Sequence, residues 1–575
     1  MQIAQRFDYD VVIMGAGLAG LSSALAMAEE HPDLRVAILT KVHPVRSHSG
    51  AAQGGINAAV AHDDRWEDHY YDTIKGGGFL GDQDAVRILT EHAPQAIYAL
   101  DRWGTTFSRN PDGSFAQRPF GGQRRNRTCY VADKTGHALL NTLYEQVLKK
   151  GVAVFAEWFV FALVADDQAF HGFLAFDNNT GQIGYFAGRA GLIATGGAGR
   201  VFGQSSNALI NTGDGMALAL RAGLPLKDIE FFQIHPTGLP NGILMSEGAR
   251  GEGGYIINVK GERFMEKYAP QFMELAPRDL VARSVQQEIN EGRAFPDGCV
   301  RLDLRHLGAE RIKTRLPQIR EIAIYFVGVD PIEEPIPIRP TVHYTMGGID
   351  VNVDCASRLP GLFAAGEASC VSVHGANRLG GNSLLEAVVY GLRSGDKIPG
   401  FLAGYRGPDR KHEQALLDRA MIEFVAVFGS APPRQERPGE SNSVPTLREE
   451  MEKAMVASFG LFRRQETMES GLADMARLVE RYKRVRVQET GLIFNSELIR
   501  ALELGYMLDI AHACALAALH RKESRGSHYR FDYPHIDNRN FLKHSLVERG
   551  ADGKLTLSYR EVTIVDTQPL DEIKY

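Results

Sequence analysis

The chain has 575 residues, of which 44% are hydrophobic and 23% are charged, and its formal net charge is -6. This length exceeds what one hydrophobic core supports, so we expect two to four domains in a globular protein. No basic tail or stripe is present, which argues against nucleic acid as a partner. The five cysteines form no CxxC pair, which argues against disulfides, a cysteine-ligated metal or an iron–sulfur cluster in this chain and indicates a reducing compartment.

The first predicted elements form a β-α-β unit, the usual start of a doubly wound sheet. Residues 10–14 (DVVIM) have the pattern of a buried strand. The sequence GAGLAG then opens a helical pattern, and a second strand is predicted at residues 35–40.

The middle of the chain alternates between helical and strand-like patterns. An amphipathic helix is predicted at 133–149, with Asp133 as its cap. Strand-like alternation follows at 152–195, and residues 235–345 have the pattern of a separate α+β unit. Another short buried strand is predicted at 361–367.

The last third of the chain is predicted to be mainly helical. A helix at 383–395 returns to the first domain, and residues 399–443 have the composition of loop and linker. Long helical patterns occupy 446–483 and 497–522, and the tail 526–575 is expected to wrap the surface. No apolar run reaches the ~18 residues that span a bilayer, so other subunits would have to hold this chain at a membrane.

The sequence GAGLAG contains the glycine pattern of a dinucleotide-binding loop. Glycines permit a tight turn and close approach of the backbone to a pyrophosphate, and the helix N-terminus attracts negative charge. The position after a strand and before a helix favours this interpretation. The residues concerned are Gly15, Ala16, Gly17 and Gly20.

The acid expected about 20 residues after this loop, where it would bind a ribose, is absent. Thr40 and Lys41 occupy that place, which argues against a simple NAD dehydrogenase. Glu367, at the end of its own predicted strand, could accept the ribose hydroxyl instead.

A second segment, RSHSGAAQGG at residues 46–55, is rich in small residues. Such a segment lets the backbone lie close to a flat ring. On its own, a histidine such as His48 would more often be an ordinary surface or hydrogen-bonded residue.

Several blocks of the sequence resemble, in the same order, the succinate dehydrogenase/fumarate reductase flavoprotein family. The resemblance covers nearly the whole chain, between residues 8 and 545. L-aspartate oxidase belongs to the same superfamily and shares many of the blocks. They are KVHPVRSHSGAAQGG, ATGGAGR, NTGDG, FFQIHPTG, SEGARGEGG, LAPRD, HYTMGG, HGANRLGGNSLLE, KESRGSHYRFDYP and NFLKHS.

The resemblance implies an α/β protein with a Rossmann-like FAD-binding domain, an inserted α+β capping domain and a C-terminal helical domain. The expected bounds are 1–234 and 346–405 for the FAD-binding domain, 235–345 for the capping domain, 406–525 for the helical domain and 526–575 for a C-terminal segment.

The cofactor that the resemblance implies is FAD, bonded covalently to His48 through its 8α-methyl group. Ser49 and Gly50 stand where the family more often has Thr and a larger residue. Aspartate oxidases lack this histidine, so its presence favours the succinate/fumarate branch. The implied FAD-binding residues are Gly15, Ala16, Gly17, Gly20, Lys41, His48, Ser49, Gly54, Gly55, Asp214, Glu367, Ser383 and Leu384.

The implied substrate is a four-carbon dicarboxylate, which requires donors and cations at both ends. By resemblance, His235 and Ser246 take one carboxylate, and His343 and Arg378 take the other. Position 246 usually holds Thr in the family, and Ser keeps the hydroxyl.

The resemblance assigns proton transfer to Arg278. Because an arginine normally stays charged, it can serve only if it is firmly positioned and connected to solvent. Glu247 and Arg250 could form that connection.

The resemblance also implies an iron–sulfur partner subunit and, through it, a membrane anchor with a quinone. The chain would then be cytoplasmic and peripheral to the inner face of the membrane. The basic run at 481–486 could belong to the docking surface or could be a solvated helix end. Two alternatives remain open at this point: L-aspartate oxidase, and a non-catalytic flavin-binding or assembly subunit.

Overall fold

The computed structural model describes residues 1–429 and 442–573. A five-stranded parallel sheet, in the order β18-β11-β2-β3-β7, forms the centre of the first unit, which we call the Rossmann unit. Helix α1 (Leu18–Glu30) connects β2 to β3, so the predicted β-α-β unit is confirmed. The strands are β2 (Val11–Met14), β3 (Val36–Thr40), β7 (Ala153–Ala156), β11 (Ala190–Ile193) and β18 (Leu362–Ala364).

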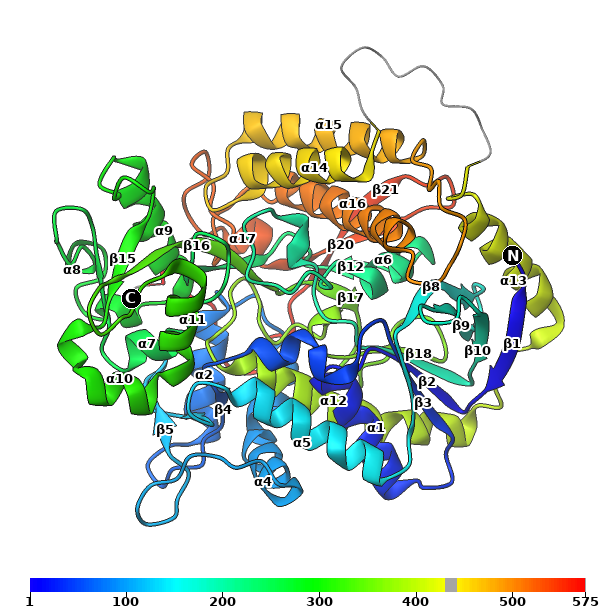
Figure 1. Ribbon diagram of the computed structural model, residues 1–575, viewed down its shortest axis with the longest axis horizontal. Coiled ribbons are helices and arrows are strands. Elements are labelled where there is room, and N and C mark those ends of the chain that lie inside the picture. Colours follow the sequence, from blue (N-terminus) through cyan, green and yellow to red (C-terminus); the bar gives the residue numbers. More distant parts are fainter. Residues whose placement is uncertain (430–441, 574–575) are drawn as a thin grey trace.

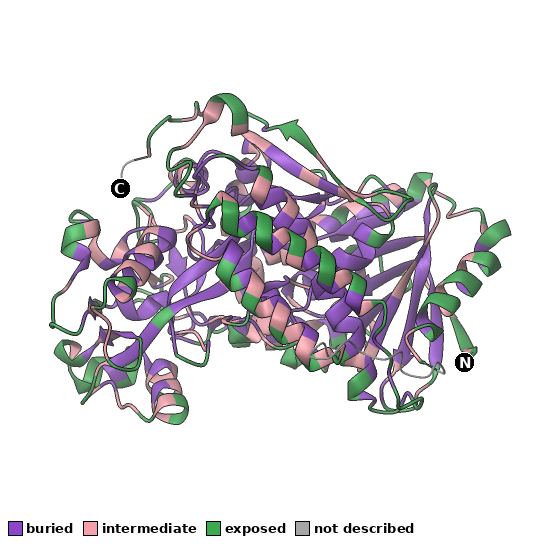
Figure 2. Cartoon of the chain, turned by 90° about the horizontal axis from the view of Figure 1, so that it is seen from above, coloured by how far each residue is buried: buried purple, intermediate pink, exposed green. Residues whose placement is uncertain are grey.

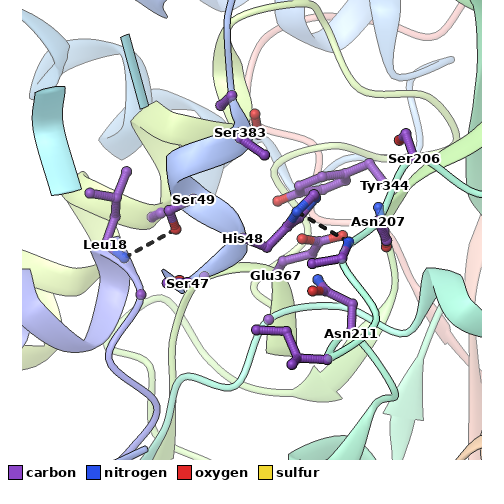
Figure 3. Close-up of a pocket in the computed structure, with 18 of the residues that line it drawn as sticks. Leu18, Ser47, His48, Ser49, Ser206, Asn207, Asn211, Tyr344, Glu367 and Ser383 are labelled. Atoms are coloured by element: carbon purple, nitrogen blue, oxygen red, sulfur yellow. Dashed lines mark hydrogen bonds between the residues drawn. The ribbon is translucent and has the colours of Figure 1, made fainter. Parts of the chain in front are cut away.

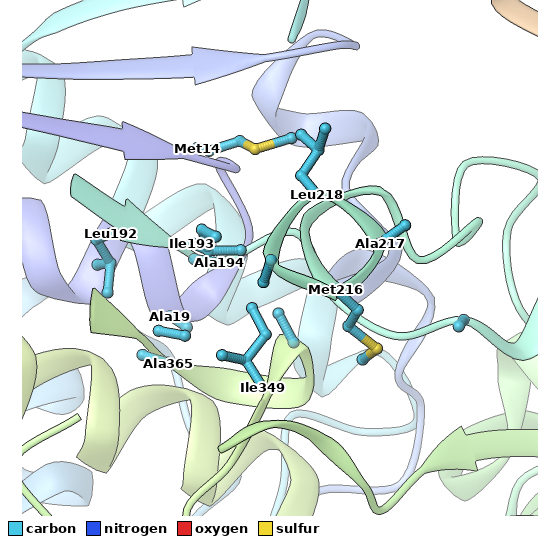
Figure 4. Packing of buried hydrophobic residues seen from close by; sticks show 14 of the residues in the cluster. Met14, Ala19, Leu192, Ile193, Ala194, Met216, Ala217, Leu218, Ile349 and Ala365 are labelled. Carbon is cyan, nitrogen blue, oxygen red and sulfur yellow. The ribbon is translucent and has the colours of Figure 1, made fainter. Parts of the chain in front are cut away.

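Both faces of this sheet are covered, by helices on one side and by a further helix and a second sheet on the other, which explains why its strands are nearly uniformly apolar. Helix α1 packs against α5 (Thr135–Lys149) and α12 (Asn382–Gly404). On the other side, Met216 and Leu218 of α6 (Asp214–Arg221) pack near Met14 and Ile193 (Figure 4). In Figure 2 the strands in the interior of the molecule are buried through most of their length, whereas outer helices and outermost strands keep an exposed face.

Asp133 does not cap α5, so that prediction was wrong. The helix begins at Thr135, and Lys134 occupies the cap position without a side-chain hydrogen bond. The carboxylate of Asp133 instead accepts a hydrogen bond from the backbone N–H of Ile319, 186 residues away in the sequence.

Residues between 44 and 132 contain more structure than their glycine-rich composition suggested. They form short strands and helices beside the Rossmann sheet. These are the 3-10 turns η1 (Pro44–Arg46) and η2 (His48–Ala51), the strands β4 (Ile56–Asn57), β5 (Gln117–Arg118) and β6 (Thr128–Cys129), and the helices α2 (Trp66–Gly76), α3 (Gln83–Glu91) and α4 (Ala93–Trp103).

A second sheet extends the Rossmann unit, as the alternation at 152–195 predicted. Its order is β1-β10-β9-β8, and β1 runs parallel to β10. The strands are β1 (Ile3–Asp8), β8 (Trp158–Ala165), β9 (Phe170–Asp177) and β10 (Ile183–Ala187).

The inserted α+β unit has its own antiparallel sheet, β13-β16-β15-β14, and its own hydrophobic core between Leu239 and Ile338. We call it the capping unit; it occupies the left end of the molecule in Figure 1. Its elements are β13 (Phe232–Gly238), α7 (Glu247–Gly251), β14 (Tyr255–Ile257), α8 (Met265–Tyr268), α9 (Arg278–Asn290), β15 (Val300–Asp303), α10 (Ala309–Arg315), α11 (Pro317–Val327) and β16 (Ile336–Thr345). The bounds 235 and 345 stay predictions.

The helical part differs from the prediction in two places. Residues 399–443 are not all loop, because α12 continues to Gly404 and α13 (Glu413–Val425) follows; the rest of this linker falls partly outside the described residues. The predicted helix 446–483 is two helices, α14 (Val444–Phe459) and α15 (Gln465–Tyr482), separated by a turn at Gly460.

Helix α16 (Ser496–His520) is long and apolar enough to cross a membrane by length and composition. However, 83% of its most apolar window is buried inside the protein, where it packs against α14, α15 and α6. It is therefore a core helix of this fold, because a helix that is apolar on all sides can be buried inside a large protein.

The C-terminal segment does more than wrap the surface. Strand β20 (Lys543–Arg549) lies inside the sheet β19-β17-β12-β20-β21. His544 on this strand is fully buried and contacts Asp228 at 2.6 Å and Asp82 at 3.1 Å. The other elements here are β12 (Leu226–Lys227), β17 (Gly348–Asp350), β19 (Ser369–Cys370), α17 (Asn538–Phe541) and β21 (Leu555–Glu561).

Candidate active site

One cavity of about 550 Å³ runs from the glycine loop of the Rossmann unit to the capping unit. Nearly all of the predicted site residues line it, although they come from segments far apart in the sequence. Gly20 and Arg250 are the exceptions. The predicted residues that line the cavity are Gly15, Ala16, Gly17, Lys41, His48, Ser49, Gly54, Gly55, Asp214, His235, Ser246, Glu247, Arg278, His343, Glu367, Arg378, Ser383 and Leu384.

The glycine loop leaves no room for larger residues. Gly15 has φ +116°, and a methyl group there would overlap the carbonyl oxygen of Ala194. A methyl group at Gly20 would overlap the Gly15 carbonyl, so Gly20 allows α1 to pack against the end of β2 without facing the cavity itself. Gly17 is the N-cap of α1, and the first N–H groups of that helix therefore face the cavity.

The His48 segment lies directly against this helix terminus. Ser49 Oγ accepts a hydrogen bond from the Leu18 N–H at 3.3 Å (Figure 3). His48 Nδ1 accepts a hydrogen bond from the Ala208 N–H at 3.3 Å, and burial lowers the pKa of His48 to about 4. The imidazole is therefore neutral, with Nε2 as its remaining nitrogen.

Gly54 and Gly55 make the next part of the cavity wall. A methyl group at Gly54 would overlap the ring of Phe120, and Gly55 has φ +137°. Together with the loop at Gly15 and Gly17, these positions form a surface of bare backbone, which we call the flavin cradle.

Lys41 is held by two carboxylates at the place where the ribose-binding acid was missing. Its Nζ lies 2.8 Å from Asp214 and 2.8 Å from Glu503, which is on α16. Burial lowers the pKa of Lys41, but these carboxylates outweigh burial and hold it above the usual range. The sequence analysis named both Lys41 and Asp214 as FAD-binding residues. It missed Glu503, which is 462 residues from Lys41.

Glu367 and the start of α12 close the cavity from the other side. Glu367 Oε1 accepts a hydrogen bond from the Thr345 N–H at 2.9 Å, and burial raises the pKa of Glu367 to about 8. Gly381, with φ 85°, is the N-cap of α12, so the N–H groups of Ser383 and Leu384 belong to the first turn of a 23-residue helix. That turn carries partial positive charge.

His235 on β13 and His343 on β16 face each other at the capping end, with ring centroids 5.2 Å apart. Burial lowers the pKa of each ring well below its usual value, and the charges on Arg278 and Arg378 add to the effect. His235 Nδ1 accepts a hydrogen bond from the Thr237 N–H, and its Nε2 has no partner among the described residues. The neutral ring therefore presents an N–H donor to the cavity.

Arg278 and Glu247 form a buried pair beside these histidines. Arg278 Nε donates to Glu247 Oε2 at 2.7 Å, and Glu247 Oε1 accepts from the Gly121 N–H at 2.7 Å. Burial alone would raise the pKa of Glu247, but Arg278 and Arg250 hold it below its usual range. Arg250 Nη2 is 3.5 Å from Glu247 Oε1, on the side away from the cavity, and Arg250 also donates to the Glu274 carbonyl.

Gln233 was missed by the sequence analysis although it lies within the FFQIHPTG block. Its Oε1 accepts hydrogen bonds from Arg278 Nη1 and Arg378 Nη2, each at 2.9 Å. Burial, with a further contribution from Arg278, lowers the pKa of Arg378 to about 9. One neutral amide thus holds two guanidinium groups of like charge side by side.

Gln53 was also not assigned a role, and it fixes the position of Ser246. The Gln53 side chain accepts from the Ser246 N–H at 3.1 Å and donates to the Leu244 carbonyl at 3.1 Å. Ser246 in turn is the N-cap of α7, where its Oγ accepts from the Gly248 N–H at 3.0 Å. Gln53 therefore connects the flavin cradle to the capping unit.

The basic run at 481–486 is only partly exposed. Arg481 is buried and forms an ion pair with Glu450, and Lys483 forms an ion pair with Glu480. Its assignment as a docking surface stays a prediction.

These residues fit FAD. The bare backbone of the cradle suits a pyrophosphate and a flat ring, and two helix N-termini supply partial positive charge. The fold and the cavity define the class: an FAD-dependent oxidoreductase with a basic pocket next to the flavin cradle. In agreement, a family of FAD binding domains matches residues 10–384, and the fumarate reductase flavoprotein C-terminal family matches residues 448–575.

Relatives match along nearly the full length. The fumarate reductase flavoprotein subunit of Mycobacterium tuberculosis is 42% identical over 98% of this chain and 99% of its own length. The succinate dehydrogenase flavoprotein subunit of Rickettsia conorii is 44% identical over 98% of this chain and 96% of its own. A structure of Escherichia coli quinol fumarate reductase superposes with a TM-score of 0.95 at 41% identity, covering 98% of both chains.

The chain therefore belongs to the succinate dehydrogenase/fumarate reductase flavoprotein family. The family and the fold class expected from the sequence are confirmed. None of these findings favours the L-aspartate oxidase alternative.

Proposed function

We propose that this chain interconverts succinate and fumarate. The observation that carries this proposal is the composition of the capping end of the cavity. His235, His343, Arg278 and Arg378 face one buried space, and Glu247, the acid beside them, is already paired with Arg278. An excess of donors and positive charge next to the flavin cradle suits a small dianion.

The two ends of the substrate would be held by different pairs. His235 Nε2–H and the Ser246 hydroxyl would bind one carboxylate, and His343 with Arg378 would bind the other. Arg378 Nε and His235 Nε2 are buried and have no partner among the described residues, so both groups are available for a ligand. Leaving such groups without a partner costs about 1–3 kcal/mol each, which a bound carboxylate would recover.

Arg278 would hold and transfer the proton at the carbon that gains or loses it. Glu247 and Gln233 hold its guanidinium on two sides, and this fixes the direction in which its remaining N–H groups point. Glu247 and Arg250 would carry the proton onward, since Glu247 lies between the two arginines. The distance of 3.5 Å from Glu247 to Arg250 is short enough for a small adjustment to complete the path.

FAD, when bound, supplies the hydride donor or acceptor. The N–H groups of Ser383 and Leu384 would stabilise negative charge that develops on the flavin, because they begin helix α12. Exclusion of water would depend on the capping unit, which forms one wall of the cavity.

We also propose that FAD is bonded covalently to His48 through Nε2. The Ala208 N–H occupies the lone pair of Nδ1, and this hydrogen bond is compatible with a substituent on Nε2. Acid precipitation followed by a fluorescence scan tests the bond: flavin should stay with the polypeptide in the wild type and appear in the supernatant for His48→Ser. Flavin released from the wild-type protein would rule out the bond.

For partners, we propose an iron–sulfur subunit and, through it, a quinone-binding membrane anchor at the inner face of the membrane. The support comes from full-length relatives: one structure with a TM-score of 0.93 at 41% identity is described as a quinol–fumarate reductase with menaquinol molecules. Co-purification of the tagged chain with an iron-containing protein from its own membranes tests this proposal.

The activity test uses purified protein and an artificial electron acceptor. Succinate should reduce the acceptor, malonate should inhibit, and both should perturb the flavin absorption spectrum. Aspartate should be a poor donor. Protein that holds FAD but shows no spectral response to any dicarboxylate would refute the proposed function.

A further inference from the structure

Helix α11 of the capping unit forms part of the active-site wall. Gln318 and Ile322, one turn apart on this helix, both line the cavity. The helix must therefore stay in place for the cavity to be closed on that side. Its side chains Ile319 and Ala323 pack into the core of the capping unit, so the helix moves with that unit.

The N-terminus of α11 is capped by a residue from the Rossmann unit. Its own N-cap position holds Leu316, which cannot accept a hydrogen bond through its side chain. Asp133, in the loop before α5, accepts from the Ile319 N–H at 3.0 Å and is only 1% exposed. A carboxylate there also interacts favourably with the helix dipole.

A second contact crosses between the units at the same place. The ring of Tyr130 contacts two guanidinium groups, with Arg118 Cζ 3.7 Å and Arg315 Cζ 5.3 Å from its centroid. Arg118 and Tyr130 belong to the Rossmann unit, whereas Arg315 is the last residue of α10, two residues before α11 begins. Arg118 also donates to the Ala132 carbonyl, which fixes the loop that carries Asp133.

We propose that the Asp133–Ile319 hydrogen bond and the Tyr130–Arg315 contact form a latch that holds the capping unit closed over the substrate. Both contacts join the two units, so they stabilise only the arrangement in which the units meet. Asp133 acts as a positioning residue through α11 and does not touch the reacting atoms. This proposal rests on the proposed function, because it concerns closure over the dicarboxylate.

The test is the rate at which bound malonate leaves the FAD-containing protein, followed by stopped-flow flavin absorbance. Loss of an N-cap shifts an equilibrium by about 5- to 30-fold, so Asp133→Ala should release malonate faster by a factor in that range. The KM for succinate should rise with it, while FAD content stays at the wild-type level. Asp133→Asn, which keeps an acceptor oxygen, should restore most of the wild-type behaviour.

Two matched controls separate the latch from a general loss of stability. Asp330→Ala removes the ion pair that Arg320 of α11 forms with Asp330, but that pair lies wholly within the capping unit. Arg315→Gln and Arg311→Gln each remove an ion pair with Glu252, but only Arg315 also contacts Tyr130. Release should accelerate for Arg315→Gln and stay unchanged for Arg311→Gln and Asp330→Ala.

The outcomes distinguish the latch from the proposed function. If the wild type responds to malonate and folded Asp133→Ala and Arg315→Gln release it at the wild-type rate, the latch is refuted and the function stands. If the wild type itself shows no response to malonate or succinate, the proposed function fails first.

Discussion

Arg278 donates from Nε to Glu247 Oε2 at 2.7 Å, and their side chains are only 7% and 1% exposed. A buried pair of this kind fixes the direction of both side chains. Since Arg278 also donates to Gln233, its planar fork spans two acceptors that a lysine could not reach together.

Arg278→Lys should therefore lower kcat by about 10²- to 10⁴-fold, the usual contribution of a positioned acid or base. FAD content and malonate binding should survive, because a positive charge is kept. Steady-state kinetics and a malonate titration measure both effects. Arg283→Lys is the control, since Arg283 lies on the same helix but pairs with Asp279 and the Gly526 carbonyl. Normal turnover by Arg278→Lys would contradict the assignment.

Gln233→Glu tests the positive charge of the pocket. A carboxylate at this buried position would lie between Arg278 and Arg378 and neutralise part of their charge. The dianion should bind less tightly, with a higher KM for succinate, while the protein stays folded. The control is Gln286→Glu on helix α9 of the capping unit, where Gln286 donates a hydrogen bond to Asn290. This variant should leave KM unchanged. An unchanged KM in Gln233→Glu would show that this amide does not control the field at the substrate.

Gly15→Ala and Gly104→Ala form a matched pair. Their φ angles are +116° and +114°, so both substitutions strain the backbone similarly. Only Gly15 also faces an obstacle, the Ala194 carbonyl, whereas nothing lies within 4 Å of a methyl group at Gly104. Gly15→Ala should lose FAD, and Gly104→Ala should keep it at a stability cost of about 1–3 kcal/mol. Flavin-to-protein ratios after purification give the answer, and equal ratios would argue against the cradle.

His544 makes stability depend on pH. Burial disfavours its charged form, but Asp228 and Asp82 outweigh burial and raise the pKa of His544 to about 9. Because the folded pKa lies above the unfolded value of 6.5, this stabilisation is fully present below pH 6.5 and is lost as pH rises through about 9. The shift corresponds to about 3 kcal/mol. Melting temperatures across this range should fall for the wild type, and the fall should be smaller for His544→Gln. The exposed His137→Gln should behave like the wild type.

The sequence was sufficient for features that depend on neighbouring residues. The strand at 10–14, the glycine loop and the strand at 35–40 follow one another, so their pattern alone predicts the β-α-β unit. The family resemblance named the candidate site residues, and most of them line one cavity in the structure.

Features that depend on distant residues were not predictable in this way. Asp133 has the local pattern of a cap for α5, yet it caps a helix 186 residues away. Glu503 meets Lys41 across 462 residues of sequence. Gln233 is important only because Arg278 and Arg378 both donate to it in the folded chain. The local periodicity of a sequence indicates helices and strands, but it does not indicate which distant residues meet in the fold.

The continuity of this cavity bears on the order in which cofactor and substrate bind. The flavin cradle and the basic pocket are one continuous space of about 550 Å³, without a protein wall between them. FAD bound in the cradle would fill one part of this space and leave the basic pocket for a small dicarboxylate. We therefore expect malonate to bind tightly only to protein that already holds its FAD.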